Sequence, residues 1–270
     1  MDDLAIELDG VWKIFGDRPA EIVENIRRDG LSKAEVLEKF NAVVGISDVS
    51  FQVNAGEIFC IMGLSGSGKS TLVRHINRLI EPTAGKITLL GQQILELSES
   101  QLREIRAKKV GMVFQHMALF PHRSVRDNVA YPLEIRKEPK LRRWDVSQRM
   151  LSMVGLDGFE DRFPTELSGG MQQRVGLARA LASDPDVLLM DEPFSALDPL
   201  IRRQLQDQFL DLSAQLNKTT LFITHDLDEA IRLGTRIAIM NDGKIVQIGT
   251  PEQIVTNPAD DYVRDFVKDI

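Results

Sequence analysis

The sequence predicts an α/β fold in which helices cover a parallel β-sheet. Short apolar runs without alternation recur along the 270-residue chain, and segments with apolar residues at helical spacing separate them. Strands that are buried on both faces have this continuous apolar character, and strands that alternate with helices pair in parallel. A glycine-rich run, Gly63–Thr71, directly follows one such strand. These observations together place the chain in the α/β class.

The N-terminal part is expected to be different. Ala5–Val11 alternates like a half-buried strand, and Ile46–Val53 is a second strand region. A strongly charged insert, residues 17–42, lies between them and has apolar residues at helical spacing. Within the insert, Ser32 followed three positions later by Glu35 predicts the start of a second helix.

The remaining elements alternate along the chain. Helical patterns cover three regions: Ser70–Leu79, Ser98–Lys109 and most of 125–181. The expected strands are five apolar runs: Ile58–Met62, Gly111–Gln115, Val187–Met190, Thr220–Thr224 and Arg236–Met240.

Composition excludes several classes of protein. The net charge of −7 disfavours nucleic acid as the main partner. The single cysteine, Cys60, excludes an internal disulfide framework and is expected in a buried strand. The acidic N-terminus lacks an export signal, and no run approaches the roughly 20 apolar residues of a membrane helix. We therefore expect a chain that reaches a membrane only through a partner.

The run after Met62 fits the pattern G-x-x-x-x-G-K-[ST], in which backbone N–H groups and a lysine hold nucleotide phosphates. We call residues 63–71 the phosphate loop. Lys69 is expected to reach the β- and γ-phosphates, and Ser70 to ligate Mg²⁺. The alternative is a glycine-rich turn with a solvent-exposed lysine, but this pattern rarely arises by chance. The candidate ATP-binding residues of the loop are Gly63, Leu64, Ser65, Gly66, Ser67, Gly68, Lys69, Ser70 and Thr71.

Two acidic residues end the apolar strand Val187–Met190. Asp191 is placed to hold Mg²⁺, directly or through water, and Glu192 to polarise an attacking water molecule. Adjacent acids at this position could instead cap a helix. His225 closes the strand Thr220–Thr224, where it could contact the γ-phosphate, although a lone histidine is more often structural.

These residues occur in the order of a known set of motifs. The phosphate loop is followed by Gln115, the run Leu167–Gln173, the acidic strand end Leu188–Glu192, the loop Ser195–Asp198, and His225. Over nearly its whole length the chain resembles the ATP-binding subunit of ATP-binding-cassette (ABC) transporters. The resemblance implies a RecA-like P-loop core with an antiparallel β subdomain and an α-helical signature subdomain at about 98–181. It also implies one ABC ATPase domain over residues 1–270.

The resemblance further implies how ATP and Mg²⁺ are bound. ATP would lie between the phosphate loop of one copy and the signature residues of a second identical copy: Ser168, Gly169, Gly170 and Gln172. Gln115 would contact Mg²⁺ and the attacking water, Glu192 and His225 would act in catalysis, and Asp198 would communicate between the copies. Phe15 matches the aromatic that stacks on adenine, with packing in the core as its alternative.

A finer resemblance is to importers of glycine betaine, proline betaine and choline, a quaternary-amine subgroup. It is based on the helical insert around Gly30–Leu37, on Met171 in the signature, and on the segments Ala196–Arg202 and Asn257–Arg264. Many members continue into a tandem regulatory module, which we expect to be absent after Ile270. Either osmoprotection or nutrient uptake would suit such a protein.

The implied partners are an integral membrane permease and, indirectly, an external substrate-binding protein. The chain would then lie peripherally on the cytoplasmic face of the inner or plasma membrane. Apolar residues within 116–131 (Met117, Leu119, Phe120, Pro121 and Val125) could receive a permease helix or could pack internally. Three alternatives stay open: an importer of another small substrate such as an amino acid, a non-transport ABC ATPase, and a small-molecule kinase.

Overall fold

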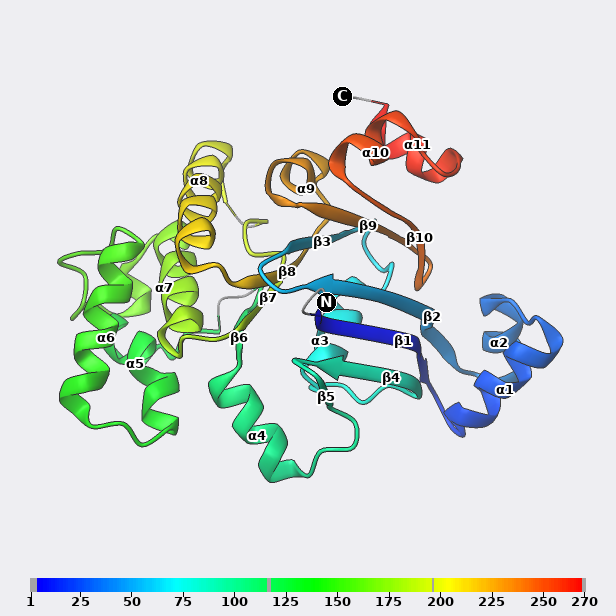
Figure 1. Cartoon of the computed structure of the whole chain (residues 1–270), viewed down its shortest axis with the longest axis horizontal. Coiled ribbons are helices and arrows are strands. Elements are labelled where there is room, and N and C mark those ends of the chain that lie inside the picture. The colour runs from blue at the N-terminus through cyan, green and yellow to red at the C-terminus, as the bar shows by residue number, and fades with distance from the viewer. Residues whose placement is uncertain (1–3, 116–117, 196, 269–270) are drawn as a thin grey trace. The chain divides into compact units, whose positions relative to one another are not determined.

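The computed structural model describes residues 4–115, 118–195 and 197–268 (Figure 1). The chain divides into two units, one within residues 1–98 and 223–270 and the other formed by residues 99–222. The first unit contains the phosphate loop, and the second contains the acidic strand end and the signature run. Within the described parts of the chain, no helix is both long and apolar enough to cross a membrane.

The first unit begins with an antiparallel sheet in the order β2-β1-β4-β5. Its strands are β1 (Leu4–Phe15), β2 (Val43–Asn54), β4 (Ala84–Leu89) and β5 (Gln92–Gln93). Buried and exposed residues alternate along β2 from Val49 to Asn54, and Ile6 of β1, opposite Val53 in the register, is fully buried. Such alternation is typical of a sheet with one solvated face.

The insert forms α1 (Pro19–Asp29) and α2 (Lys33–Phe40). The predicted helix start is confirmed, because the Ser32 side chain accepts from the Glu35 N–H while the Glu35 carboxylate accepts from the Ser32 N–H. Ile22, Val23 and Val36 pack with Trp12 and Val44 of the sheet. Figure 1 shows both helices beside one end of β1 and β2.

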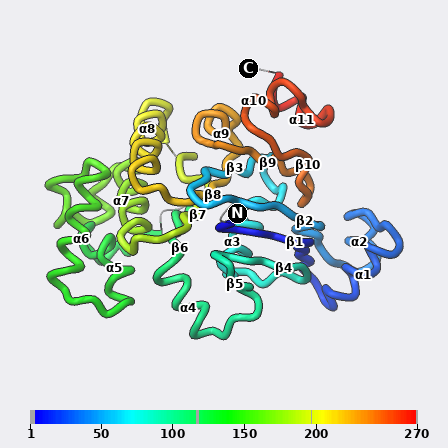
Figure 2. The backbone as a smooth tube through the Cα atoms, viewed as in Figure 1, coloured from blue at the N-terminus to red at the C-terminus, as the bar shows by residue number. Residues whose placement is uncertain are grey.

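The first unit also contains three strands in the order β10-β9-β3. β3 runs parallel to β9 as predicted, whereas β9 and β10 form an antiparallel hairpin. Figure 2 follows the chain from this hairpin into the two last helices. The elements are β3 (Ile58–Met62), α3 (Lys69–Ile76), α9 (Leu227–Leu233), β9 (Arg236–Asn241), β10 (Lys244–Gly249), α10 (Pro251–Thr256) and α11 (Asp261–Val267).

The second unit combines packed helices with strands in the order β8-β7-β6. β6 and β7 pair in parallel, as predicted, and α5, α6 and α7 pack against one another. The helices are α4 (Glu99–Lys108), α5 (Val125–Ile135), α6 (Lys140–Met153), the 3₁₀ helix η1 (Pro164–Glu166), α7 (Gly169–Ala182) and α8 (Pro199–Leu216). The strands are β6 (Val110–Val113), β7 (Val187–Asp191) and β8 (Thr219–Thr224), the last of which ends in the first unit.

Candidate functional site

The phosphate loop connects a buried strand to a helix. All five residues of β3 are buried, including Cys60, as predicted. Burial raises the pKa of the Cys60 thiol well above its ordinary value, so this cysteine is a packing residue. After the loop, α3 begins at Lys69 with Gly68 as its N-cap at φ 103°. Glycine suits this left-handed conformation and places no side chain over the first N–H groups of the helix.

Lys69 is folded into its own loop. Its side chain is almost fully buried, and its Nζ donates to the carbonyl oxygens of Gly63 at 2.7 Å and Leu64 at 2.9 Å. A buried ammonium group requires such partners, because desolvation of a charge is costly. The loop thus holds its cation beside the first N–H groups of α3, where an anion is favoured.

Two other strands and a turn lie close to the phosphate loop. A Cβ on Gly63 would lie 2.1 Å from the Met240 carbonyl oxygen, and one on Gly68 would lie 2.7 Å from that of Gly45. Gly243, in the β9–β10 turn, donates its N–H to the Ser67 carbonyl at 2.9 Å. Sequence analysis did not select Gly45 or Gly243. A Cβ on Gly243 would lie 2.6 Å from the Gly45 carbonyl, so backbone proximity is the reason for both glycines.

One buried hydroxyl group in the loop supports the binding of a phosphate group there. The Ser67 hydroxyl is buried and has no hydrogen-bond partner among the described residues. A buried hydroxyl without a partner is costly, and a phosphate oxygen in the loop would supply one. The described residues contain no group of three or more His, Cys, Asp or Glu that could hold a metal ion. Mg²⁺ is nevertheless often held by one or two protein ligands together with phosphates, and the Ser70 hydroxyl and the Asp191 carboxylate are each an oxygen donor of the type it accepts.

Phe15 is the last residue of β1, and its side chain is partly exposed. Its side chain is 43% exposed, and the Lys13 Nζ lies 5.1 Å from the centre of its ring. Its cross-strand partner Val43 is also exposed. The structure therefore leaves an apolar surface at Phe15 that a flat ring could cover, and the alternative of core packing applies less well to an exposed side chain.

The acidic strand end lies in the second unit. Asp191 is the last residue of β7 and is 1% exposed. Glu192 follows in the left-handed conformation, at φ 47°, and its Oε2 accepts from Gln115 Nε2 at 3.1 Å. A non-glycine residue in this conformation is strained, and such strain is concentrated at functional sites. Two residues chosen separately from the sequence are thus hydrogen-bonded to each other.

The signature run begins α7. The Ser168 side chain accepts from the Met171 N–H and caps the helix, and Gly169 has only open space where a side chain would be. A Cβ on Gly170 would lie 2.7 Å from the side chain of Ile201 in α8. Gln172 Nε2 donates to the carbonyl oxygens of Pro164 and Leu167, which fixes the chain before the helix.

The last two candidates lie at the starts of helices. Asp198 accepts from the Ile201 N–H at 3.2 Å and caps α8. His225 directly follows β8 and is exposed. The roles proposed for them in communication and catalysis stay predictions.

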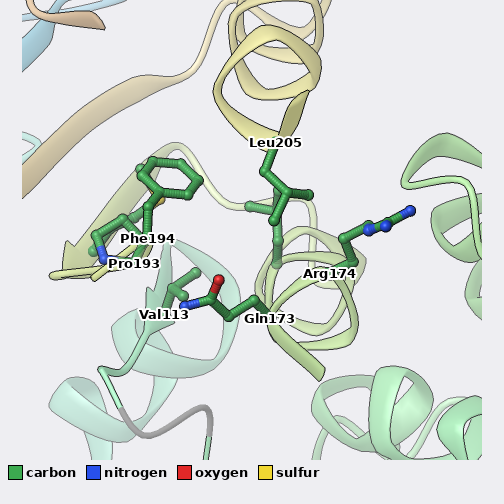
Figure 3. Close-up of a pocket in the computed structure, with 8 residues that line it drawn as sticks. Val113, Gln173, Arg174, Pro193, Phe194 and Leu205 are labelled. Atoms are coloured by element: carbon green, nitrogen blue, oxygen red, sulfur yellow. The ribbon is translucent and has the colours of Figure 1, made fainter. Parts of the chain in front are cut away.

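A small pocket lies beside α7 (Figure 3). Gln173 extends from α7 toward Val113 at the end of β6, while Pro193, Phe194 and Leu205 form other walls. The volume is about 10 Å³, close to that of one water molecule. Both polar atoms of the Gln173 side chain are buried without a hydrogen-bond partner in the described structure. Sequence analysis did not select Gln173, whose only signal was its place in the signature run.

The segment that could contact a permease, residues 116–131, is partly buried inside the second unit. Asn128, fully buried, accepts from the Phe120 N–H and donates to the carbonyls of Phe120, Arg123 and Ser124. Val125 is also fully buried, so its apolar side chain packs inside the unit and is not part of a surface patch. His116 and Met117 lie outside the described residues.

Comparison with known proteins identifies relatives of the chain. The sequence model of the family described as "ABC transporter" matches residues 46–195. The glycine betaine transport ATP-binding protein of Bacillus subtilis is 55% identical over 99% of this chain and 64% of its own length. The glycine betaine/proline betaine transport system ATP-binding protein of Escherichia coli is 51% identical over 99% of this chain and 66% of its own length. The trimethylamine N-oxide transport system ATP-binding protein of Pelagibacter ubique is 50% identical over 100% of this chain and 79% of its own length.

The chain thus spans slightly less than two thirds of the length of the first two relatives.

Among solved structures, a dimeric post-hydrolysis state of an ATP-binding cassette bound to ADP and Pi is similar, with a TM-score of 0.76 and 30% identity. The match covers 91% of this chain and 98% of that one. It confirms the predicted fold class, a P-loop core with an antiparallel β subdomain and a helical signature subdomain.

Proposed function

Because the chain belongs to the ABC transporter ATP-binding family, we propose that it is the ATP-hydrolysing subunit of a transporter. The observation that carries this proposal is the presence of both a phosphate loop and a separate signature helix whose start is exposed at Ser168 and Gly169. A phosphate loop alone would serve a kinase equally well. The second anion-binding helix start is what a kinase would not need.

The residues have distinct roles in this proposal. The N–H groups of the phosphate loop and Lys69 bind the β- and γ-phosphates. Mg²⁺, when bound, neutralises phosphate charge; Ser70, Gln115 and Asp191 would hold it. Glu192 accepts the proton of the attacking water, and its bond from Gln115 orients the carboxylate. The exposed ring of Phe15 stacks on adenine.

A second copy of the chain completes the site. Ser168, Gly169 and Gly170 of that copy contact the γ-phosphate, because a helix start with glycines lets the backbone approach an anion closely. Gln172 holds the chain before this helix in place. Asp198 and His225 serve communication and γ-phosphate sensing. Loss of the γ-phosphate would then separate the two copies.

The transported substrate is proposed to be a betaine-type osmolyte or nutrient. Relatives are named for glycine betaine, carnitine, choline and trimethylamine N-oxide. These molecules share a nitrogen atom that carries four substituents. The chain would act from the cytoplasmic face of the membrane, bound to a permease that receives substrate from an external binding protein.

Reconstitution tests this function. The chain is assembled in proteoliposomes with a candidate permease and substrate-binding protein, ATP is enclosed, and uptake of radiolabelled glycine betaine or choline is measured. We expect ATP-dependent uptake that is absent with Glu192→Gln. Uptake of an amino acid in place of these amines would overturn the substrate assignment, and the absence of any ATP-dependent uptake in the presence of the permease and binding protein would overturn the transport role.

A further inference from the structure

Gly45 is the extra residue of a bulge between the first two strands. The register pairs Ile14 with Val44 and Lys13 with Ile46. Gly45 therefore has no residue opposite it on β1. Its backbone does not adopt the left-handed conformation, so conformational freedom does not require a glycine here. A glycine inside a strand also occurs where another group approaches the backbone closely, and two groups lie this close to Gly45.

The first of these groups is the ring of Phe15. A Cβ on Gly45 would lie 2.7 Å from the ring atom Cε2 and 3.3 Å from Cδ2. Both distances are shorter than the separation of about 3.5–4.0 Å at which two carbon atoms attract each other best. The ring can therefore lie where it does only because residue 45 has no side chain. Since Phe15 is partly exposed, its ring can move toward solvent if this space is filled.

The second group is the start of the helix that follows the phosphate loop. A Cβ on Gly68, the N-cap of α3, would lie 2.7 Å from the Gly45 carbonyl oxygen. The β9–β10 turn connects the same two segments. The Ser47 N–H donates to the Gly243 carbonyl at 2.8 Å, and the Gly243 N–H donates to the Ser67 carbonyl at 2.9 Å. β2 is thus held at Gly45 in a fixed position beside the phosphate loop.

We propose that Gly45 is a positioning residue that sets the place of the Phe15 ring relative to the phosphate loop. The inference rests on the proposed role of Phe15 in stacking on adenine. Gly45 lies against the ring on one side and, through its carbonyl group, against the start of α3 on the other. A side chain at residue 45 would displace the ring and lower the affinity for the base, while Lys69 and the N–H groups that bind phosphate would stay in place.

Gly45→Ala tests the proposal, because it adds a single methyl group beside the ring. The loss of base stacking predicts an increase of about five- to thirtyfold in the Kd for MgADP by calorimetry and in the KM for ATP. The Kd for magnesium tripolyphosphate, which has no base, should stay within about twofold. We expect kcat also to stay within about twofold, because Gln115 and Glu192 are unchanged.

Gly234→Ala is the matched control in the same unit. Gly234 follows α9 without the left-handed conformation, and a Cβ there would lie 2.8 Å from the Ala230 carbonyl oxygen. The substitution therefore introduces a comparable collision that does not involve Phe15 or the phosphate loop. It should lower the melting temperature but leave the Kd for MgADP unchanged.

A double-mutant cycle separates displacement of the ring from distortion of the phosphate loop. Phe15→Ala removes the ring, so the addition of Gly45→Ala to this variant should change the Kd for MgADP by less than about twofold. A Kd for MgADP in Gly45→Ala equal to that of the wild type would overturn the inference. An equal rise in the Kd for magnesium tripolyphosphate, or an undiminished effect in the Phe15→Ala background, would also overturn it. If Phe15→Ala alone bound MgADP as tightly as the wild type, the proposed stacking role of Phe15 would itself fail.

Discussion

The starts of α3 and α7 are both suited to an anion, yet their surroundings differ. At α3, Lys69 is buried, and the neighbouring glycines approach other backbones so closely that a Cβ would collide with carbonyl oxygens. At α7, Ser168 and Gly169 are exposed, and a Cβ on Gly169 would meet nothing within 4 Å. One helix start is enclosed by its own unit, and the other faces open space.

This difference indicates which contacts each region has already made. The phosphate loop has its cation, its supports and its orientation fixed before a ligand arrives, so nucleotide affinity should depend on contacts inside the first unit. The signature start has a rigid cap and an uncovered surface, which is the form expected of a group that completes a site on another molecule. The following predictions test this contrast, from the largest expected effect to the smallest.

Glu192→Gln separates hydrolysis from binding. Removal of the proton acceptor should lower kcat for ATP by about 10²- to 10⁴-fold, the usual contribution of a general base. The Kd for MgADP should remain near that of the wild type, because the phosphate loop is untouched. With ATP present, size-exclusion chromatography should show a stable dimer. Undiminished turnover would remove Glu192 from its role.

Lys69→Ala tests the enclosed helix start. The substitution deletes a cation that would donate charge-assisted hydrogen bonds to phosphate, so nucleotide affinity should fall by about 10- to 100-fold. Calorimetry with MgADP measures this directly. A matched change at the open helix start, Ser168→Ala, should leave MgADP affinity of the monomer unchanged. Equal affinities for Lys69→Ala and the wild type would contradict the assignment of the phosphate loop.

Two glycine substitutions, one in the phosphate loop and one at the start of α7, test how far each region contributes to the stability of the fold. Gly63→Ala places a methyl group 2.1 Å from the Met240 carbonyl oxygen and should lower the free energy of unfolding by about 1–3 kcal/mol or more. Gly169→Ala meets open space and should leave the melting temperature essentially unchanged, while it weakens ATP-dependent dimer formation. Thermal unfolding and sedimentation measure the two effects. Similar destabilisation by both substitutions would remove the contrast between the helix starts.

The smallest effect concerns pH and α3. Burial lowers the pKa of His75 below its ordinary value near 6.5, while the hydrogen bond of its Nδ1 with the Ile80 carbonyl opposes the shift. Below that ordinary value the unfolded chain binds a proton that the folded chain does not, so stability is lost as pH falls. Between about pH 7 and pH 5 the melting temperature should fall by a few °C, and less in His75→Gln. An identical pH profile for both proteins would contradict this role of His75.

The sequence predicted those parts whose signals are local. β3 has the predicted bounds, because an apolar run between turn residues has one interpretation, and the capping box of α2 is a pattern of neighbouring residues. β4 and β10 were not delineated, because each is only six residues long and mixes apolar residues with glycine and polar residues. α3 is shorter than expected: it ends at Ile76, and the helical spacing alone did not reveal this.

The candidate site shows the same division between local and distant signals. The motifs gave Lys69, Gln115 and Glu192, and the bond between Gln115 and Glu192 joins two of them across 77 positions of sequence. Their supports could not be read from one sequence. Gly45 and Gly243 lie against the phosphate loop through backbone atoms, and nothing in a residue's own type shows which distant carbonyl or N–H it will meet.

The dependence of ATPase activity on protein concentration tests the central claim most directly. If the open start of α7 completes a site on a second copy, activity per molecule should rise steeply with concentration at saturating ATP and then level off as the dimer forms. Activity per molecule that stays constant under dilution, in a preparation that sedimentation shows to be monomeric, would contradict the account.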